Sequence, residues 1–268
     1  MSGTGSTVKL GTGRFGLVAL GLLLLASVAW SGSVCAEELR LMTYNIRNCT
    51  GLTGREPVNV TPIAEVIKKQ APDVVALQEV DQNTNRNGNR NLPNELGECT
   101  GMKSFYAPAC AYDGGKYGIV MLLKKEPQAQ GNIPLQSRFP ELKEEHQTLQ
   151  VLEFPGYVLF HTHMARKERV RLEWVKVIDE EARKYEKPIF LLGDFNTWPG
   201  TKTFVELQRQ GWRSLGPEDA KTFPANAPRR QIDFVLVRNA PQLKVKRAEV
   251  INAPTESDHR PIVVEVEF

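Results

Sequence analysis

Six short apolar runs in this chain end or begin with acids, amides or imidazoles, and this pattern limits how the chain can fold. Five runs end in such residues and the sixth begins with one: Tyr44-Asn45, Gln78-Glu79, Thr162-His163, Gly193-Asp194-Phe195-Asn196, Ser257-Asp258-His259 and Ile232-Asp233-Phe234. Soluble proteins normally keep carboxylates away from the ends of core strands, because an unpaired buried charge is costly. We therefore expect six strands whose polar ends meet at one site. This mixture of acids, amides and imidazoles suits a hard metal ion and a phosphate ester.

The periodicity of apolar residues predicts interspersed strands and helices. Strand patterns cover residues 39–46, 73–80, 118–123, 149–154, 157–160, 189–192, 232–237 and 261–268. Helix patterns cover residues 61–70, capped by Thr61, 170–178 and 202–210. Residues 81–98, rich in Asn, Arg and Gly, are expected to form a long polar loop. Several strand pairs resemble hairpins, which favours an α+β sandwich over a purely parallel sheet.

Residues 1–36 have the pattern of a secretory signal peptide. Lys9 and Arg14 precede an apolar stretch, residues 15–30, and Val34-Cys35-Ala36 resembles a cleavage site. We predict cleavage after Ala36 and a secreted or periplasmic protein, with a retained N-terminal membrane anchor as the alternative. Residues 37–268 show no repeat or linker, so we expect one domain, and we expect it to be monomeric.

The charge of the chain argues against a protein that binds long nucleic acids over its whole surface. The chain has 34 Lys+Arg and 31 Asp+Glu, and losing Lys9 and Arg14 with the first segment would leave 32 basic residues (34 − 2) against 31 acids. Proteins that bind DNA through many phosphates usually carry a basic surplus. A local basic strip remains, formed by Arg166, Lys167, Arg169, Arg171 and Arg229-Arg230.

Three cysteines, Cys49, Cys99 and Cys110, would remain after cleavage. Export would permit a disulfide, and we expect Cys99–Cys110 because it closes a short loop, with Cys49–Cys99 as the alternative. None of the three has CxxC spacing, so the pattern does not indicate a zinc site.

Glu79 is the strongest candidate for a metal ligand, because it directly follows the apolar run of a core strand. Mg²⁺ takes oxygen ligands, commonly one or two carboxylates with water and substrate phosphate. Asn45 can offer a neutral oxygen to the same ion, and Asp258 a second carboxylate. Taken singly, Glu79 fits a solvated strand end and Asn45 fits a turn, so the metal interpretation depends on their meeting at one site.

Asp194 and Asn196 carry more information as a pair than singly. Two positions apart in an extended segment, their side chains point the same way. The acid can orient or deprotonate a water and the amide can donate to a phosphoryl oxygen, while Gly193 permits close backbone approach. An Asx turn before the next helix is the alternative. The strongly apolar run before Gly193 favours the functional interpretation.

The four histidines divide into two with expected chemical roles and two with expected structural roles. His259 follows an acid, but neighbours in a strand face opposite sides, so a different acid should hold its ring. We assign Asp233 to hold His259 in one tautomer and His259 to contact the scissile phosphate. His163 is the second imidazole expected at the phosphate. His146 and His161 are assigned structural roles.

Together these motifs resemble the endonuclease/exonuclease/phosphatase family, whose fold is also called deoxyribonuclease-I-like. Six segments in the family's order carry the resemblance: Thr43-Tyr44-Asn45-Ile46, Val75-Ala76-Leu77-Gln78-Glu79-Val80, Thr162-His163-Met164, Gly193-Asp194-Phe195-Asn196, Arg230-Gln231-Ile232-Asp233-Phe234 and Ser257-Asp258-His259-Arg260-Pro261. The resemblance runs from about residue 39 to the C-terminus, and the complete set is highly specific.

The resemblance implies an α+β fold, a four-layer sandwich of two packed mixed β-sheets flanked by helices, with residues 37–268 as the catalytic domain. It also implies cleavage of a phosphoester by water, dependent on Mg²⁺ or Mn²⁺. By position it implies that Asn45, Glu79 and Asp258 surround the metal, that His163, Asn196 and His259 contact the phosphate, that Asp194 positions the attacking water, and that Asp233 pairs with His259.

Three positions depart from the family's usual pattern, and all three concern substrate contacts. Ile119 follows Tyr117-Gly118 where Asn is frequent, His146-Gln147 stand where an Arg is frequent, and His161 precedes Thr162-His163 where Asn is common.

Two catalytic functions therefore fit the sequence. Near-neutral charge favours a phosphodiesterase or phosphatase acting on a small or lipid-derived phosphoester, including membrane lipid. The alternative is an exported nuclease for DNA or RNA, with Arg229-Arg230 and the polar residues Asn85, Arg86, Asn87, Asn89 and Arg90 as phosphate contacts. A non-catalytic binding protein on the same scaffold is disfavoured by the complete set of motifs.

Overall fold

Two six-stranded sheets form the centre of the computed structural model, which describes Gly3, residues 5–7 and residues 37–268. The first sheet contains, in spatial order, β11 (Lys244–Val250), β12 (Ile262–Glu267), β1 (Glu38–Asn45), β2 (Val74–Gln82), β4 (Gly115–Leu123) and β3 (Lys103–Tyr112). The second contains β5 (Ala129–Leu135), β6 (Gln147–Glu153), β7 (Val158–His163), β8 (Ile189–Asp194), β10 (Asp233–Arg238) and β9 (Arg213–Ser214). Each sheet is mixed, because β1–β2 and β7–β8 pair in parallel while the other neighbours are antiparallel.

Alternating side chains on each central strand separate an inner from an outer face. On β1, Leu39 and Leu41 enter the core between the two sheets, whereas Met42 and Tyr44 enter the core beneath the helices. Strand β8 alternates in the same way between the inter-sheet core and the core under its own helices. This period of two explains why both sheets are hydrophobic on both faces.

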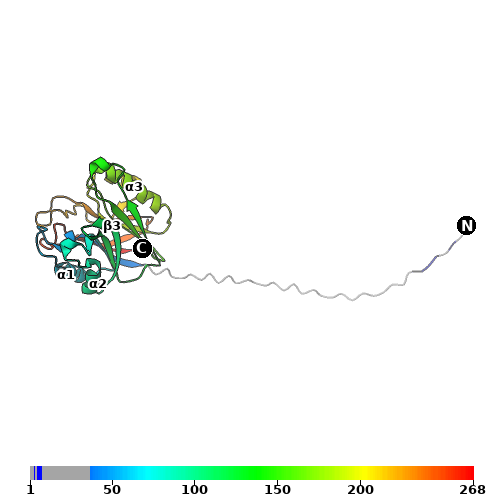
Figure 1. Cartoon of the computed structure of the whole chain (residues 1–268). Helices are drawn as coiled ribbons and strands as arrows, with labels where there is room; N and C mark the ends of the chain where they lie inside the picture. The colour runs from blue at the N-terminus through cyan, green and yellow to red at the C-terminus, as the bar shows by residue number, and fades with distance from the viewer. Residues whose placement is uncertain (1–2, 4, 8–36) are drawn as a thin grey trace. The chain divides into compact units, whose positions relative to one another are not determined.

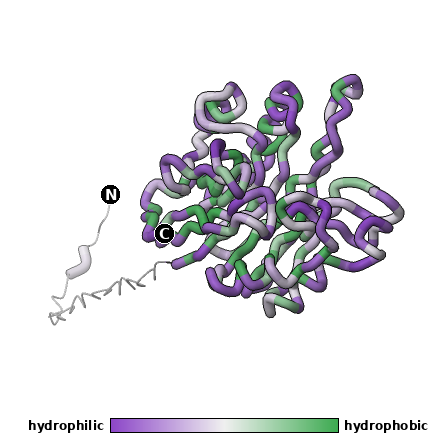
Figure 2. Tube along the Cα trace, turned by 90° about the vertical axis from the view of Figure 1, so that its left-hand side faces the viewer, coloured by the Kyte–Doolittle hydropathy of each residue, from purple (hydrophilic) through white to green (hydrophobic). Residues whose placement is uncertain are grey.

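Four α-helices cover the outer faces of the two sheets. Helices α1 (Thr61–Gln70) and α2 (Leu92–Thr100) pack on the first sheet, and α3 (Glu168–Ala182) and α4 (Lys202–Arg209) pack on the second. Figure 1 shows α1 and α2 on one side of the domain and α3 on the other. Hydrophobic segments run through the middle and hydrophilic ones line the outer loops (Figure 2). The predicted four-layer sandwich of two mixed sheets is confirmed.

The expected polar loop over residues 81–98 is wrong in its second half, because α2 begins at Leu92. The Asn91 side chain accepts a hydrogen bond from the Asn94 N–H, which caps the helix, and Leu92 and Leu96 bury one face of it. Polar composition hid this short amphipathic helix. The Thr61 cap is also wrong, since Thr61 lies inside α1 and its N–H donates to the Asn59 side chain instead.

The expected Cys99–Cys110 disulfide is wrong, and so is the Cys49–Cys99 alternative. Cys49, Cys99 and Cys110 are all free, with Cys49 buried. Cys99 lies at the end of α2, just before β3, whereas Cys110 lies seven residues beyond the first residue of that strand. At roughly 3.3 Å per residue this separates them by about 20 Å, far more than a disulfide spans.

None of the helices among the described residues is long and apolar enough to cross a membrane. The predicted signal peptide, residues 1–36, lies outside the described residues apart from Gly3 and residues 5–7. Its cleavage and the secreted or periplasmic location therefore stay predictions.

Candidate active site

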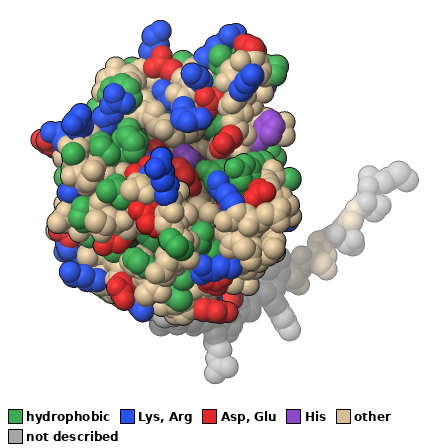
Figure 3. Space-filling model, turned by 60° about the vertical axis from the view of Figure 1, so that its left-hand side comes forward, with side chains coloured by type: hydrophobic (Ala, Val, Ile, Leu, Met, Phe, Trp, Pro, Cys, Tyr) green, Lys and Arg blue, Asp and Glu red, His purple; other side chains and the backbone are tan. Residues whose placement is uncertain are grey.

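A cavity of about 650 Å³ opens where strands of both sheets end. Six of the eight predicted site residues line it: Glu79, His163, Asp194, Asn196, Asp258 and His259. The other two, Asn45 and Asp233, are fully buried and hydrogen-bond to members of this group. Figure 3 shows a histidine deep in a hollow with acidic and basic side chains around its mouth. The polar strand ends thus converge on one place.

Glu79 reaches the cavity because β2 is irregular at this point. The register between β2 and β4 shifts between Leu77 and Val80, and Glu79 has a positive φ of 59°. Such a bulge turns a side chain that regular alternation would direct elsewhere. The preceding Gln78 instead faces the interior, where its amide donates to His161 Nε2 at 2.7 Å. Gln78 and His161 therefore belong to the buried scaffold.

Asn45 links the carboxylates of the two sheets. Its amide nitrogen donates to Glu79 Oε1 at 2.9 Å and to Asp194 Oδ2 at 3.1 Å. Its oxygen accepts the Arg47 backbone N–H at 3.1 Å. The predicted ligand role of Asn45 needs this oxygen to face the metal, so the amide would have to turn over.

The carboxylates of Glu79 and Asp258 suit a hard divalent cation. Glu79 and Asp258 contribute carboxylate oxygens, which Mg²⁺ and Mn²⁺ prefer. Burial raises the pKa of Asp258, and the negative charge of Glu79 raises it further, against the opposing effect of His259 and Arg47. Arg47 Nη1 lies 3.2 Å from Asp258 Oδ2. A cation between the two acids would relieve their mutual repulsion.

The turn after β8 holds both Asp194 and Asn196 at the cavity. The sequence pattern predicted an extended segment here. This prediction is wrong, because Asn196 has a positive φ of 47° and the chain turns. The Asn196 N–H donates to Asp194 Oδ1 at 2.8 Å, as in an Asx turn. The Asn196 amide nitrogen donates to Met164 O at 2.9 Å and lies 3.1 Å from His163 Nε2. Asp194 and Asn196 thus form the local turn and also face the cavity.

Two acids of the second sheet face the ring nitrogens of His259, and only Asp233 lies within hydrogen-bond distance. Its Nδ1 lies 2.9 Å from Asp233 Oδ2, and its Nε2 lies 3.7 Å from Asp194 Oδ2. Burial acts to lower the pKa of His259, but the charges of Asp233 and Asp194 outweigh it and raise the pKa to about 10. Burial likewise acts to raise the pKa of Asp194, but His259 and His163 lower it to about 2. The site therefore pairs an ionised Asp194 with a protonated His259.

Asp194, Asp233 and His259 each offer one atom within 4.8 Å of the others, close enough to resemble a metal site. All three are buried, and His259 Nδ1 is already engaged by Asp233. His259 Nδ1 is therefore not free to coordinate an ion. Glu79 and Asp258, which also line the cavity, are more exposed than these three residues.

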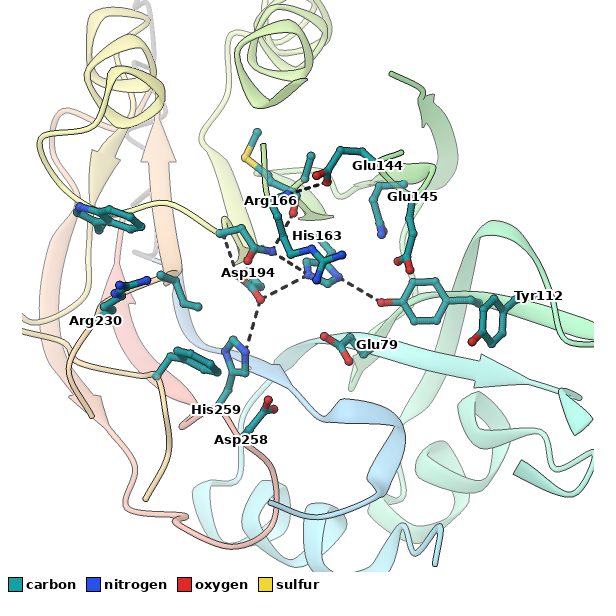
Figure 4. A pocket seen from close by; sticks show the side chains of 18 of the residues that line it. Glu79, Tyr112, Glu144, Glu145, His163, Arg166, Asp194, Arg230, Asp258 and His259 are labelled. Atoms are coloured by element: carbon teal, nitrogen blue, oxygen red, sulfur yellow. Dashed lines mark hydrogen bonds and ion pairs between the residues drawn. The ribbon is translucent and has the colours of Figure 1, made fainter. Parts of the chain in front are cut away.

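His163 completes the group from the end of β7. Its Nδ1 lies 3.5 Å from the Tyr117 hydroxyl and its Nε2 lies 3.5 Å from Asp194 Oδ2 (Figure 4). Burial acts to lower the pKa of His163, but the hydrogen bond and charge of Asp194 raise it overall. Tyr117 was noted from the sequence only as the start of an atypical segment, and nothing in its pattern indicated this contact.

Several cavity residues have no recognisable pattern in the sequence. Aromatic side chains of Tyr112, Trp198 and Phe223 line the walls, and the Phe223 ring packs 4.9 Å from the His259 ring. These residues come from loops and a strand end without a distinguishing pattern. The expected basic strip is divided: Arg166 and Arg230 line the cavity, whereas the buried Arg171 donates to backbone carbonyls.

Gly193 lets the backbones of β7 and β8 lie close together next to the site. A Cβ at Gly193 would overlap the Thr162 carbonyl oxygen, and its φ of +154° disfavours any other residue. We expect Gly193→Ala to lower the free energy of unfolding by about 3 kcal/mol, measured by urea denaturation. Gly216→Ala is the control, because its nearest neighbour would lie 3.8 Å away. Equal stability of the two variants would contradict this packing argument.

The chain matches the Endonuclease/Exonuclease/phosphatase family over residues 42–259. Among solved structures, an endonuclease/exonuclease/phosphatase from Beutenbergia cavernae superimposes with a TM-score of 0.71 at 19% identity, covering 86% of this chain and 72% of that one. A family protein from Bacteroides thetaiotaomicron gives 0.69 at 19% identity, covering 87% and 98%. A mannosyl-6-phosphatase from the same organism gives 0.66 at 19% identity, covering 86% and 100%. At such identities, the structural likeness establishes the fold alone.

Proposed function

The chain belongs to the endonuclease/exonuclease/phosphatase family, and on this premise we propose that it hydrolyses a small or lipid-derived phosphoester with the help of Mg²⁺ or Mn²⁺. Members of this family hydrolyse phosphoesters. The observation that carries the proposal is the convergence of eight acids, amides and imidazoles from both sheets at one cavity.

Glu79 and Asp258 would hold the metal ion, with Asn45 beside Glu79. Once bound, a divalent cation would offset the negative charge that develops on the phosphate during reaction. The other residues act on water and phosphate. His163, Asn196 and His259 would donate hydrogen bonds to the phosphate oxygens, since all three line the cavity around Asp194.

Asp194 is the residue that would receive a hydrogen bond from the attacking water. Its low pKa keeps it ionised at neutral pH, so it can orient the water and accept its proton. The water oxygen would form a bond to phosphorus as its proton passes to Asp194, and the ester P–O bond would break. The leaving oxygen would take up a proton from solvent and depart as an alcohol. Asp233 holds the His259 ring by its Nδ1, leaving Nε2 free to face the phosphate.

Two acidic residues on one side of the cavity disfavour a long nucleic acid that extends in that direction. Glu144 and Glu145 lie at the same cavity as the proposed metal ligands, and they would repel an extended polyanion. A mannosyl-6-phosphatase among the structural neighbours is consistent with a small phosphorylated substrate. The predicted signal peptide supports action outside the cytoplasm.

A substrate panel tests this proposal directly. We expect release of product from an aryl phosphodiester, an inositol phosphate or a phospholipid in Mg²⁺ or Mn²⁺, and no release in a chelator. Cleavage of plasmid DNA or RNA, with affinity that falls steeply as salt is added, would instead favour the nuclease. No hydrolysis of any member by the metal-loaded protein would support the non-catalytic alternative.

A further inference from the structure

The three arginines that line the cavity differ in whether an acidic side chain pairs with their guanidinium group. The guanidinium of Arg86 binds the buried Asp81 through two hydrogen bonds, of 2.6 and 2.7 Å, so its charge is already compensated. Across residues 37–268, no hydrogen bond or ion pair engages the guanidinium of Arg230 or Arg166. A cationic side chain left without a carboxylate beside a substrate cavity is available to bind an anion.

Arg230 is the better placed of these two arginines, because its surroundings fix its position. Its guanidinium carbon lies 5.1 Å from the centre of the Trp198 ring, and the Trp198 residue is 44% exposed. The Arg230 backbone also exchanges two hydrogen bonds of 3.0 Å with Phe223, whose ring packs against His259. Stacking and backbone pairing therefore hold Arg230 at the cavity wall formed by Phe223, whose ring contacts the histidine expected at the scissile phosphate.

The two sides of the cavity have opposite charge preferences. Figure 4 shows Arg230 on one side of the group formed by His163, Asp194 and His259, with Glu145 and Tyr112 on the other. A negatively charged group of the substrate would be repelled by Glu145 and attracted by Arg230. The structure thus distinguishes the two directions in which a substrate can extend from the central phosphate.

We propose that Arg230, stacked on Trp198, binds a second phosphate of the substrate, next to the phosphate that is hydrolysed. This inference rests on the proposed phosphoester hydrolysis for the place of the first phosphate. The second phosphate could belong to a short nucleotide chain or to a bisphosphorylated polyol, because either presents the same anionic group to the guanidinium.

Equilibrium binding separates these sources and does not require turnover. Calorimetric titration of the full-length protein in EDTA would compare TpT with pTpT, and inositol 1-phosphate with inositol 1,4-bisphosphate. We expect the second phosphate to strengthen binding by about tenfold in one of the two pairs. Arg230→Ala should abolish this gain. Arg229→Ala is the matched control, since it removes the same charge from the neighbouring exposed position and should preserve the gain.

The proposal is overturned if neither bisphosphate binds more tightly than its partner, or if Arg229→Ala and Arg230→Ala reduce the gain equally. If the member of the better-bound pair that carries the second phosphate is hydrolysed, Arg230→Ala should raise its KM about tenfold and leave kcat unchanged, and the KM of the member without that phosphate should stay the same. A gain in binding that depends on Arg230, without hydrolysis of any substrate, would retain this inference while rejecting the proposed function.

Discussion

Replacing His259 with alanine is expected to lower kcat by about 1000-fold on the best substrate, with the fold retained. The His259 ring is fixed by Asp233 at 2.9 Å, and its Nε2 lies 3.7 Å from Asp194. It is therefore a rigid donor placed beside the carboxylate that would orient the water. Steady-state kinetics in Mg²⁺ would measure the loss, and circular dichroism with thermal unfolding would verify the fold.

His146→Ala is the matched control for this prediction. His146 is exposed and is not among the cavity-lining residues that the structure describes, so its loss should leave kcat within about twofold of the parent protein. If His259→Ala also remained within a few fold of the parent, the role assigned to His259 would be wrong.

A second variant separates the function of His259 from the cost of leaving Asp233 unpaired. Removing the imidazole leaves a fully buried carboxylate without its partner, which can destabilise the protein. Asp233→Asn keeps the size of the side chain and removes its charge. We expect this variant to fold and to lower kcat by about tenfold or more, because the His259 ring loses the acid that fixes its orientation.

The strands that carry the site could be predicted because their apolar runs are long and end abruptly in polar residues. The patterns over residues 73–80 and 189–192 correspond to β2 and β8, and the polar ends of both strands lie at the cavity. The alternation of apolar and polar side chains is a local property, so a strand can be recognised from it even when its partner strands are unknown. The same reasoning identified the hairpin of β6 and β7.

Elements that depend on tertiary context were missed. Strands β3, β5 and β11 carry many exposed or half-buried residues at or near sheet edges, so their patterns are weak. The bulge that turns Glu79 toward the cavity arises from pairing between β2 and β4, which a single segment does not reveal. The cavity walls formed by Trp198 and Phe223 likewise depend on how loops fold over the strand ends.

Glu79 offers the sharpest test of where the metal binds. We expect Glu79→Gln to weaken Mn²⁺ binding by at least about 10-fold to 100-fold, because the amide keeps the shape of the carboxylate and removes its charge. Calorimetric titration would measure the affinity, and activity as a function of Mg²⁺ concentration would shift in the same direction. Glu145→Gln is the control, since it removes an acid from the same cavity on the Tyr112 side.

An unchanged Mn²⁺ affinity in Glu79→Gln would reject Glu79 as a ligand and direct attention to Asp194, Asp233 and His259, whose atoms lie within 4.8 Å of one another. The two sites can be distinguished by protonation. A cation bound by that trio must displace the hydrogen-bonded proton of His259, so its binding would release a proton near neutral pH. A cation held by Glu79 and Asp258 would leave the proton of His259 in place and so would release fewer protons. Calorimetry in buffers of different ionisation enthalpy measures this difference, and we expect the smaller release.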